Sequence, residues 1–174
     1  MFKNSKKIKP QEVILYDSIL SLSRNKLFFT KFDLADTFQN RIYLIFMHIS
    51  FLFEKIKQNN KKVTYKVFYQ KMFDLIFNRI ELNMREIGYG DTVINKNMKF
   101  LVRAFYNILL NCENFNERGL NSKKIFFLKY LRHNNIRKEV DNNPLIEYFA
   151  KYQAFCFDLS LDSVLKGTLN FKYK

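Results

Sequence analysis

Hydrophobic residues recur three and four positions apart along most of the chain, with polar residues between them. This spacing gathers apolar side chains on one face of a helix. It predicts six helices, at about residues 11–24, 38–58, 65–87, 91–115, 122–133 and 143–158. Four glycines and two prolines are few interruptions for 174 residues. The pattern therefore predicts an all-α fold, a single-domain helical bundle of about six helices over residues 10–174, preceded by a basic flexible arm at residues 1–9.

The segment 38–58 is expected to be the central helix, because apolar residues cover more than half of its circumference. Its most apolar run, residues 42–53, has His48 and Ser50 as its clearly polar members. A helix that crosses a membrane needs about 20 apolar residues. The run is shorter than that, so the sequence predicts a buried core helix. His48 is expected to be a core histidine bonded to a neighbouring group.

The segment 122–133 is predicted to be a shorter helix that packs one face on the core. Ser122 can cap its first turn, and the spacing of Ile125, Leu128 and Leu131 places these three side chains inward. His133 falls at the end of the helix, where a partly charged imidazole is favourable. We therefore interpret His133 as structural.

Residues 84–91 read Met-Arg-Glu-Ile-Gly-Tyr-Gly-Asp and lie between two long helical segments. Gly88 can take the left-handed conformation that ends a helix. Gly90 can supply a second positive φ or allow a close approach of backbone. Asp91 can accept hydrogen bonds from the first N–H groups of the next helix. The local chemistry thus predicts a helix–helix corner.

Charged residues at and before this corner suggest a second interpretation. Arg85, Glu86 and Asp91 would form an exposed charged cluster on a rigid turn. Upstream, Asp36 and Arg41 can act as one unit, with the aspartate capping the helix that starts near residue 38 and the arginine in its second turn. The simpler alternative for this pair is a cap with a local ion pair.

A basic stripe is predicted on the helix that follows the corner. Lys96, Lys99, Arg103 and Tyr106 occur at i, i+3, i+7 and i+10, which places them on one side of a helix. This stripe is either a solvated face or an electrostatic docking surface. Tyr106 favours docking, because Tyr and Arg are enriched where proteins bind each other.

The overall charge points to an anionic partner. The chain has 30 Lys and Arg against 16 Asp and Glu, a formal net charge of +14, with 20 Phe and 10 Tyr. Such a charge favours RNA, a ribosome or an anionic membrane leaflet as a partner. An AT-rich genome also produces a Lys- and Phe-rich composition, so charge alone does not decide the partner.

Candidate catalytic chemistry is sparse. Cys112 and Cys156 lie in apolar helical patterns and are expected to be buried, reduced thiols. No Ser-His-Asp or Cys-His arrangement, glycine-rich phosphate loop or metal-ligand spacing is present. We therefore expect no enzymatic activity, no metal and no cofactor. No signal peptide is visible, so a cytoplasmic location is expected.

Three segments together resemble the ubiquinol–cytochrome c chaperone family. They are Asp-Thr-Phe-Gln-Asn-Arg at residues 36–41, the corner at 84–91, and Lys-Asn-Met-Lys at 96–99 leading to Ala-Phe-Tyr at 104–106. The chain departs from the family pattern at Asn107 and Ile108, where Gly-Arg is usual, and at Arg79, where an acidic residue is usual. The resemblance covers residues 24–106 well and the last third loosely.

The resemblance implies an all-helical, non-enzymatic assembly chaperone for the cytochrome bc complex. Its client would be newly made cytochrome b, with the ribosome, an anionic membrane surface and a second chaperone subunit as further partners and with no small-molecule substrate. The protein would then be cytoplasmic and peripheral on the cytoplasmic face of the inner membrane. The expected partner-binding residues are Asp36, Arg41, Arg85, Glu86, Gly88, Gly90, Asp91, Lys96, Lys99, Arg103 and Tyr106.

Two alternatives remain at the level of the sequence. The first is a generic RNA- or ribosome-binding helical protein, which would bind RNA in a salt-sensitive way without any client. The second is a small helical enzyme acting on an isoprenoid or a quinone. That enzyme would need a deep pocket with converging carboxylates, and the sequence has no paired acidic motif for one.

Overall fold

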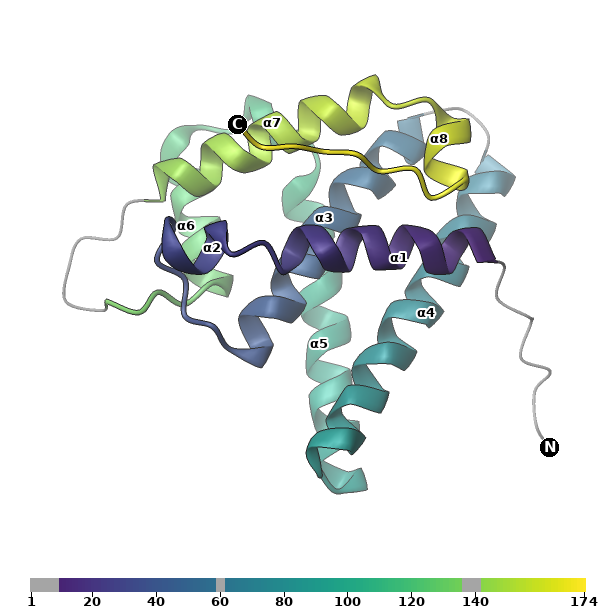
Figure 1. Ribbon diagram of the computed structural model, residues 1–174, viewed down its shortest axis with the longest axis vertical. Coiled ribbons are helices and arrows are strands. Elements are labelled where there is room, and N and C mark those ends of the chain that lie inside the picture. The colour runs from purple at the N-terminus through teal and green to yellow at the C-terminus, as the bar shows by residue number, and fades with distance from the viewer. Residues whose placement is uncertain (1–9, 59–61, 136–141) are drawn as a thin grey trace.

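The computed structural model describes residues 10–58, 62–135 and 142–174, and in these ranges the chain forms one helical domain (Figure 1). Six helices have 11 residues or more: α1 (Pro10–Ser23), α3 (Phe38–Gln58), α4 (Lys62–Ile87), α5 (Asp91–Cys112), α6 (Leu120–Tyr130) and α7 (Asn143–Asp158). Three shorter elements complete the described residues: α2 (Leu27–Thr30), a 3-10 turn (Phe115–Glu117) and α8 (Leu161–Leu165). The predicted all-α fold is confirmed. The arm predicted at residues 1–9 lies outside the described residues.

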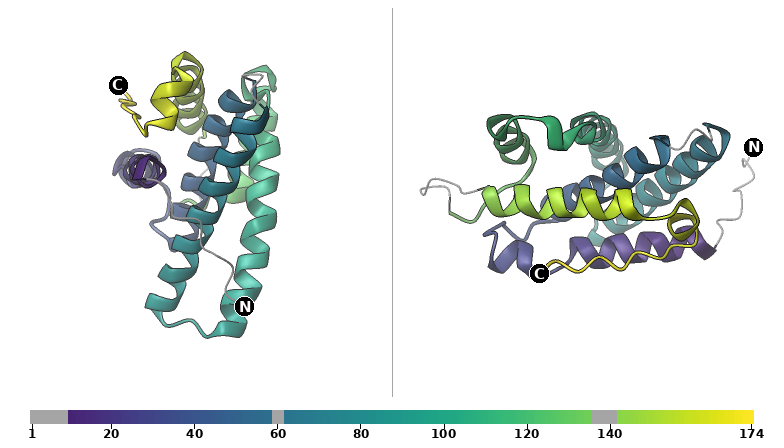
Figure 2. Two further views of the ribbon diagram at one scale, coloured as in Figure 1. Left: turned by 90° about the vertical axis from the view of Figure 1, so that its right-hand side faces the viewer. Right: turned by 90° about the horizontal axis from the view of Figure 1, so that it is seen from above.

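Helix α3 is the centre of the fold and packs against α1, α4, α5 and α7. Figure 2 (left) shows α1 and α7 on one side of α3 and α4, with α5 on the other. Every residue of α3 from Ile42 to Glu54 is buried, as the apolar pattern predicts. Within the described parts of the chain, no helix is long and apolar enough to cross a membrane.

The start of α3 corrects one expectation about its cap. The Thr37 Oγ1 accepts a hydrogen bond from the Asn40 backbone N–H at 3.1 Å, so Thr37 caps the helix. Asp36 does not cap it, because its carboxylate is bound by Arg41. The threonine hydroxyl is one residue closer to the helix and reaches the third N–H of the first turn, the usual target of a capping side chain.

Helix α6 presents a different face to the core from the one that its spacing predicts. Ile125 and Leu128 were expected inward, yet 61% and 52% of their surfaces are exposed. Aromatic side chains of the same helix are buried in their place: Phe126, Phe127 and Tyr130. Because apolar residues cover both sides of α6, the periodicity does not select a face, and the larger aromatic rings have more surface to bury. Ser122 does not cap the helix either, because Gly119 occupies the cap position and Ser122 lies inside the first turn.

Candidate functional site

The corner between α4 and α5 closes as the sequence predicts at its first glycine but not at its second. Gly88 has a φ of +99°. Its N–H donates to the Arg85 carbonyl at 3.0 Å, and the Tyr89 N–H donates to the Met84 carbonyl at 3.1 Å, the pair of bonds that ends many helices. Gly90 has an extended backbone with a φ of −74° and open space around it. It therefore supplies neither a positive φ nor a close approach.

Arg85 fastens the two helices together across this corner. Its Nη2 lies 2.8 Å from Glu81 Oε1, and its Nη1 lies 2.6 Å from Asp91 Oδ1. These hydrogen bonds raise the pKa of the Arg85 guanidinium. Asp91 is the first residue of α5 and makes no capping bond, which corrects the expectation for it, although its charge still lies at the favourable end of the helix. Glu86 is exposed and belongs to neither of the two ion pairs of Arg85.

Asp36 and Arg41 form a bidentate ion pair at the start of α3, as predicted. Arg41 Nε lies 2.6 Å from Asp36 Oδ1, and Arg41 Nη2 lies 2.9 Å from Asp36 Oδ2. The hydrogen bonds from Arg41 hold the pKa of the Asp36 carboxyl below its ordinary value. The guanidinium also lies over the Phe29 ring, 5.4 Å from the ring centre, so the pair is fixed to the side of α2.

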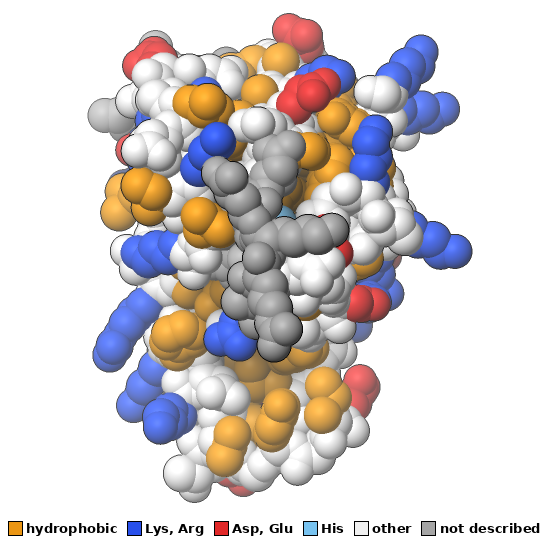
Figure 3. Space-filling model, turned by 90° about the vertical axis from the view of Figure 1, so that its left-hand side faces the viewer, with side chains coloured by type: hydrophobic (Ala, Val, Ile, Leu, Met, Phe, Trp, Pro, Cys, Tyr) orange, Lys and Arg blue, Asp and Glu red, His pale blue; other side chains and the backbone are white. Residues whose placement is uncertain are grey.

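A groove of about 310 Å³ lies between the start of α3 and the corner. We call it the corner groove. Its walls come from segments far apart in the sequence: Thr37, Phe38, Gln39, Ile42, Met84, Tyr89, Asn97, Phe100 and Leu101. Tyr89 and Phe100 keep 45% and 54% of their surfaces exposed at its mouth. In Figure 3, hydrophobic side chains gather over the lower part of the molecule, where the corner lies.

The predicted residues border this groove more than they line it. Asp36 and Arg41 are chain neighbours of wall residues in α3, and Lys96 and Lys99 are neighbours of wall residues in α5. The wall aromatic Phe100 was missed by sequence reasoning. The sequence did contain an indication, because Phe100 is a large aromatic residue that lies off the buried face of its helix.

The basic stripe of α5 is exposed. Lys96, Lys99 and Arg103 all face solvent, and none of them forms a salt bridge with another residue in the described ranges. Arg103 and Tyr106 lie beyond the groove. The Tyr106 ring packs 6.1 Å from that of Phe73 on α4, so this part of the predicted surface is partly fixed by packing.

His48 and Glu54 are buried polar groups that do not line the groove. The His48 side chain is fully buried and bonded on both ring nitrogens, as predicted for a core histidine, and burial lowers its pKa to about 4. Glu54 was not predicted to be special. Its two oxygens accept hydrogen bonds from the Asn114 backbone N–H at 3.2 Å and from Gln153 Nε2 at 3.3 Å. Burial raises the pKa of the Glu54 carboxyl.

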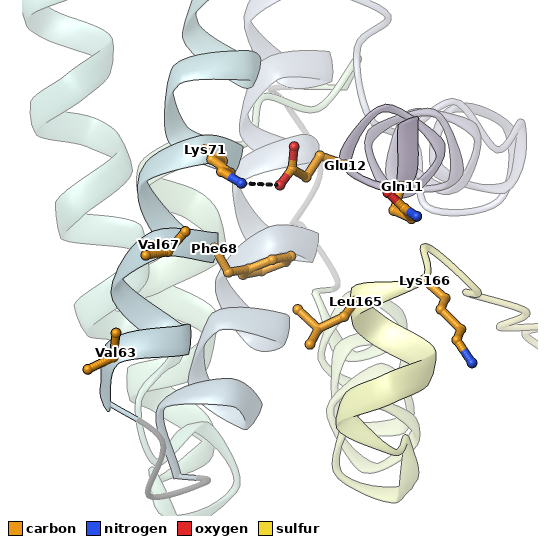
Figure 4. A pocket seen from close by; sticks show the side chains of 8 residues that line it. All are labelled: Gln11, Glu12, Val63, Val67, Phe68, Lys71, Leu165 and Lys166. Atoms are coloured by element: carbon orange, nitrogen blue, oxygen red, sulfur yellow. Dashed lines mark ion pairs between the residues drawn. The ribbon is translucent and has the colours of Figure 1, made fainter. Parts of the chain in front are cut away.

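A second cavity, of about 450 Å³, lies between α1, α4 and α8. Figure 4 shows an ion pair on one wall, with Lys71 Nζ 3.3 Å from Glu12 Oε1, and apolar side chains such as Phe68 and Leu165 on the others. None of the predicted partner-binding residues lines this cavity. Cys112 and Cys156 line neither cavity and are buried as predicted, and burial raises the pKa of both thiols.

Comparison with known proteins adds a family and a fold. A family model described as ubiquinol-cytochrome C chaperone matches residues 30–169. The fold is similar to that of the Cbp3 homolog from Brucella abortus, a crystal structure, with a TM-score of 0.77 and 20% sequence identity. That similarity covers 93% of this chain and 88% of the other. No curated protein matches the chain.

Proposed function

The chain belongs to the ubiquinol-cytochrome C chaperone family, and from that premise we propose that it holds newly made cytochrome b while the cytochrome bc complex is assembled. The family match covers the corner, the start of α3 and the basic stripe. The proposal assigns binding to the protein and no chemical step. It places this binding in the cytoplasm, at the inner membrane where the client is inserted.

The corner groove is the observation that carries the proposal. Its floor is apolar, and Tyr89 and Phe100 stand half-exposed at its mouth. Exposed aromatic side chains beside a groove are typical of surfaces that take up an apolar helix of a partner. A volume of about 310 Å³ has room for a few side chains of such a helix and leaves the rest of the client outside.

Ion pairs give the groove a charged, fixed border. The Asp36–Arg41 pair flanks the α3 wall, and the Arg85–Asp91 pair ties the corner that carries Tyr89. Covering a charge that already has a partner costs less than covering an unpaired charge. The pairs can therefore border a bound client at a smaller cost than free charges would.

Lys96, Lys99 and Arg103 support a contact with the ribosome as part of the same proposal. Lys96 and Lys99 point to solvent beside the groove and Arg103 points to solvent farther along α5, and all three can attract the phosphates of ribosomal RNA. A protein whose sole function is RNA binding would use this stripe without the groove. A substitution of Phe100 distinguishes the two functions. It alters the groove and leaves the charge of the stripe intact, so it should impair client binding and not RNA binding.

Site-specific cross-linking tests the proposal. A photoreactive phenylalanine analogue placed at Phe100 or Tyr89 should form an adduct with newly made cytochrome b in cells. The same analogue at Val63, which is 78% exposed at the opposite end of α4, is the matched control. Adducts from Val63 alone would contradict the groove as the client site.

A genetic measurement completes the test. Phe100→Ser should lower the cytochrome b content while the purified protein keeps its helical circular dichroism and melting temperature, because the ring is more than half exposed. Normal cytochrome b content in a strain that produces the variant at the wild-type level would also contradict the proposal.

A further inference from the structure

Helix α6 carries an outward aliphatic ridge with lysines along its sides. Ile125 and Leu128 are 61% and 52% exposed and lie three residues apart, on one face of the helix. Lys124 and Lys129 fall on opposite edges of that face at 100° per residue. Leu120, 56% exposed at the first residue of the helix, adds a third aliphatic side chain. We call these three aliphatic residues and two lysines the α6 ridge.

The segment that carries the α6 ridge is basic, and the acidic residue nearest before it is Glu117. Residues 118–135 contain five Lys and Arg and no Asp or Glu. The residues that pack α6 on the core, Phe126, Phe127 and Tyr130, lie on the other side of the helix, so the ridge is not part of the core.

We propose that the α6 ridge docks on the surface of an anionic lipid bilayer. Ile125 and Leu128 enter the boundary between the headgroups and the acyl chains, and Lys124 and Lys129 meet lipid phosphates at the same depth. RNA would satisfy the lysines but offers no aliphatic environment for the ridge. The contact is peripheral, because in the described parts of the chain no helix can cross a membrane.

This surface is separate from the one assigned to the client. The corner groove is built from α3, α5 and the α4–α5 corner, and no residue of α6 lines it. A chaperone docked by α6 would keep that groove open beside the bilayer. The docking can be measured with lipids alone, so its outcome does not depend on whether cytochrome b is the client.

Flotation with lipid vesicles tests the proposal. The full chain should bind vesicles of phosphatidylcholine mixed with phosphatidylglycerol and should not bind vesicles of pure phosphatidylcholine. Lys124→Gln with Lys129→Gln should weaken binding about 25-fold, at about fivefold for each lysine. Lys66→Gln with Lys172→Gln removes the same charge from exposed sites on α4 and the C-terminal segment and should have little effect.

The aliphatic part of the α6 ridge has its own matched pair. Leu128→Asn should reduce vesicle binding severalfold, whereas Leu82→Asn, at a residue that is 44% exposed on α4, should not. Equal losses in both lysine pairs would mean that total charge alone drives binding, and wild-type binding by Leu128→Asn would mean that nothing inserts. Either result overturns the proposal.

A fluorescent label reports the orientation directly. Both native cysteines are buried, so an introduced exposed cysteine can be labelled selectively. An environment-sensitive dye on Asn121→Cys, next to the ridge, should shift to the blue when anionic vesicles are added, and the same dye on Asn78→Cys of α4 should not. No shift at residue 121, or a shift caused by an RNA oligonucleotide and not by vesicles, would overturn the lipid assignment.

Discussion

His48 and Tyr148 are hydrogen-bonded inside the core, although 100 residues separate them in the sequence. Tyr148 Oη lies 2.8 Å from His48 Nε2, and His48 Nδ1 lies 2.6 Å from the Leu44 carbonyl oxygen. A carbonyl only accepts, so Nδ1 carries the proton, and Nε2 accepts from the tyrosine hydroxyl. The bond joins α3 to α7, and burial favours the neutral imidazole that accepts it.

We predict that this histidine makes the protein less stable in mild acid. Burial lowers the pKa of His48 from 6.5 to about 4. Between these values the unfolded chain binds a proton that the folded chain does not, so stability is complete above about pH 6.5 and falls as the pH drops toward 4. The loss over this window should be roughly 3 kcal/mol. Urea unfolding at a series of pH values measures it.

Two variants isolate the contribution of His48. His48→Gln should flatten the pH dependence in this window, even if the variant is less stable at every pH. His133→Gln removes the other histidine, which lies half-buried at the β-bridge to Leu34, and is the matched control. The same slope in all three proteins would show that other groups cause it.

The bounds of the helices were predictable wherever a sharp chemical boundary coincides with the apolar pattern. The segment 38–58 is predicted from its apolar pattern and is observed as a helix, although Thr37 and not Asp36 supplies its cap. The segment 143–158 is likewise predicted and observed, with Pro144 in its first turn. Helix α6 shows the limit of this reasoning, because apolar residues on two faces leave the choice of face to the neighbouring helices.

A second prediction concerns Glu54, which the sequence did not single out. Burial raises the pKa of its carboxyl, so ionisation opposes folding, and stability falls as the pH rises through the interval between the unfolded and the folded pKa. Glu54→Gln removes this charge. The new amide keeps one oxygen for the Asn114 N–H, and its N–H can bond Gln153 Oε1 once the Gln153 amide turns over, in place of the bond from Gln153 Nε2. The variant should gain about 1 kcal/mol at neutral pH.

Chemical unfolding at neutral pH measures this effect as the free energy of unfolding of the wild type, Glu54→Gln and Glu54→Ala. The alanine variant loses both hydrogen bonds, to Asn114 and to Gln153, and should be destabilised. A glutamine variant less stable than the wild type at neutral pH would show that the carboxylate is required in its charged form.

The two glycines of the corner provide a third prediction. Gly88→Ala should cost about 1–2 kcal/mol, because φ is +99° there and a Cβ is strained in that region. Gly90→Ala should be neutral or stabilising by up to about 1 kcal/mol, because its φ is −74°. A Cβ at either position meets no atom within 4 Å, so backbone conformation alone separates them. Thermal unfolding of both variants is the measurement, and equal costs would contradict the argument.

The candidate site was only partly readable from the sequence, for a physical reason. The Asp36–Arg41 pair and the turn at Gly88 are local, and their chemistry lies within a few consecutive residues. The corner groove depends on where the start of α3 meets the corner, as in the wall shared by Phe38 and Tyr89. No local sequence pattern shows that these two segments meet. Asp91 illustrates the same limit, because Gly90 occupies the cap position and the Asp91 carboxylate binds Arg85.

The fourth prediction tests the basic stripe in cells. Lys96→Glu with Lys99→Glu should lower the level of the assembled cytochrome bc complex severalfold, because reversing two exposed charges turns attraction to an anionic surface into repulsion. Both side chains are exposed and form no salt bridge with other described residues, so the fold should be unaffected. Lys66→Glu with Lys172→Glu makes the same change in net charge elsewhere and should leave the complex at its normal level.

Spectroscopic haem content and blue-native gels of membranes measure the level of the complex, with immunoblots to show equal amounts of each variant. Unchanged complex levels in the Lys96 and Lys99 double variant would mean that the stripe is an ordinary solvated face.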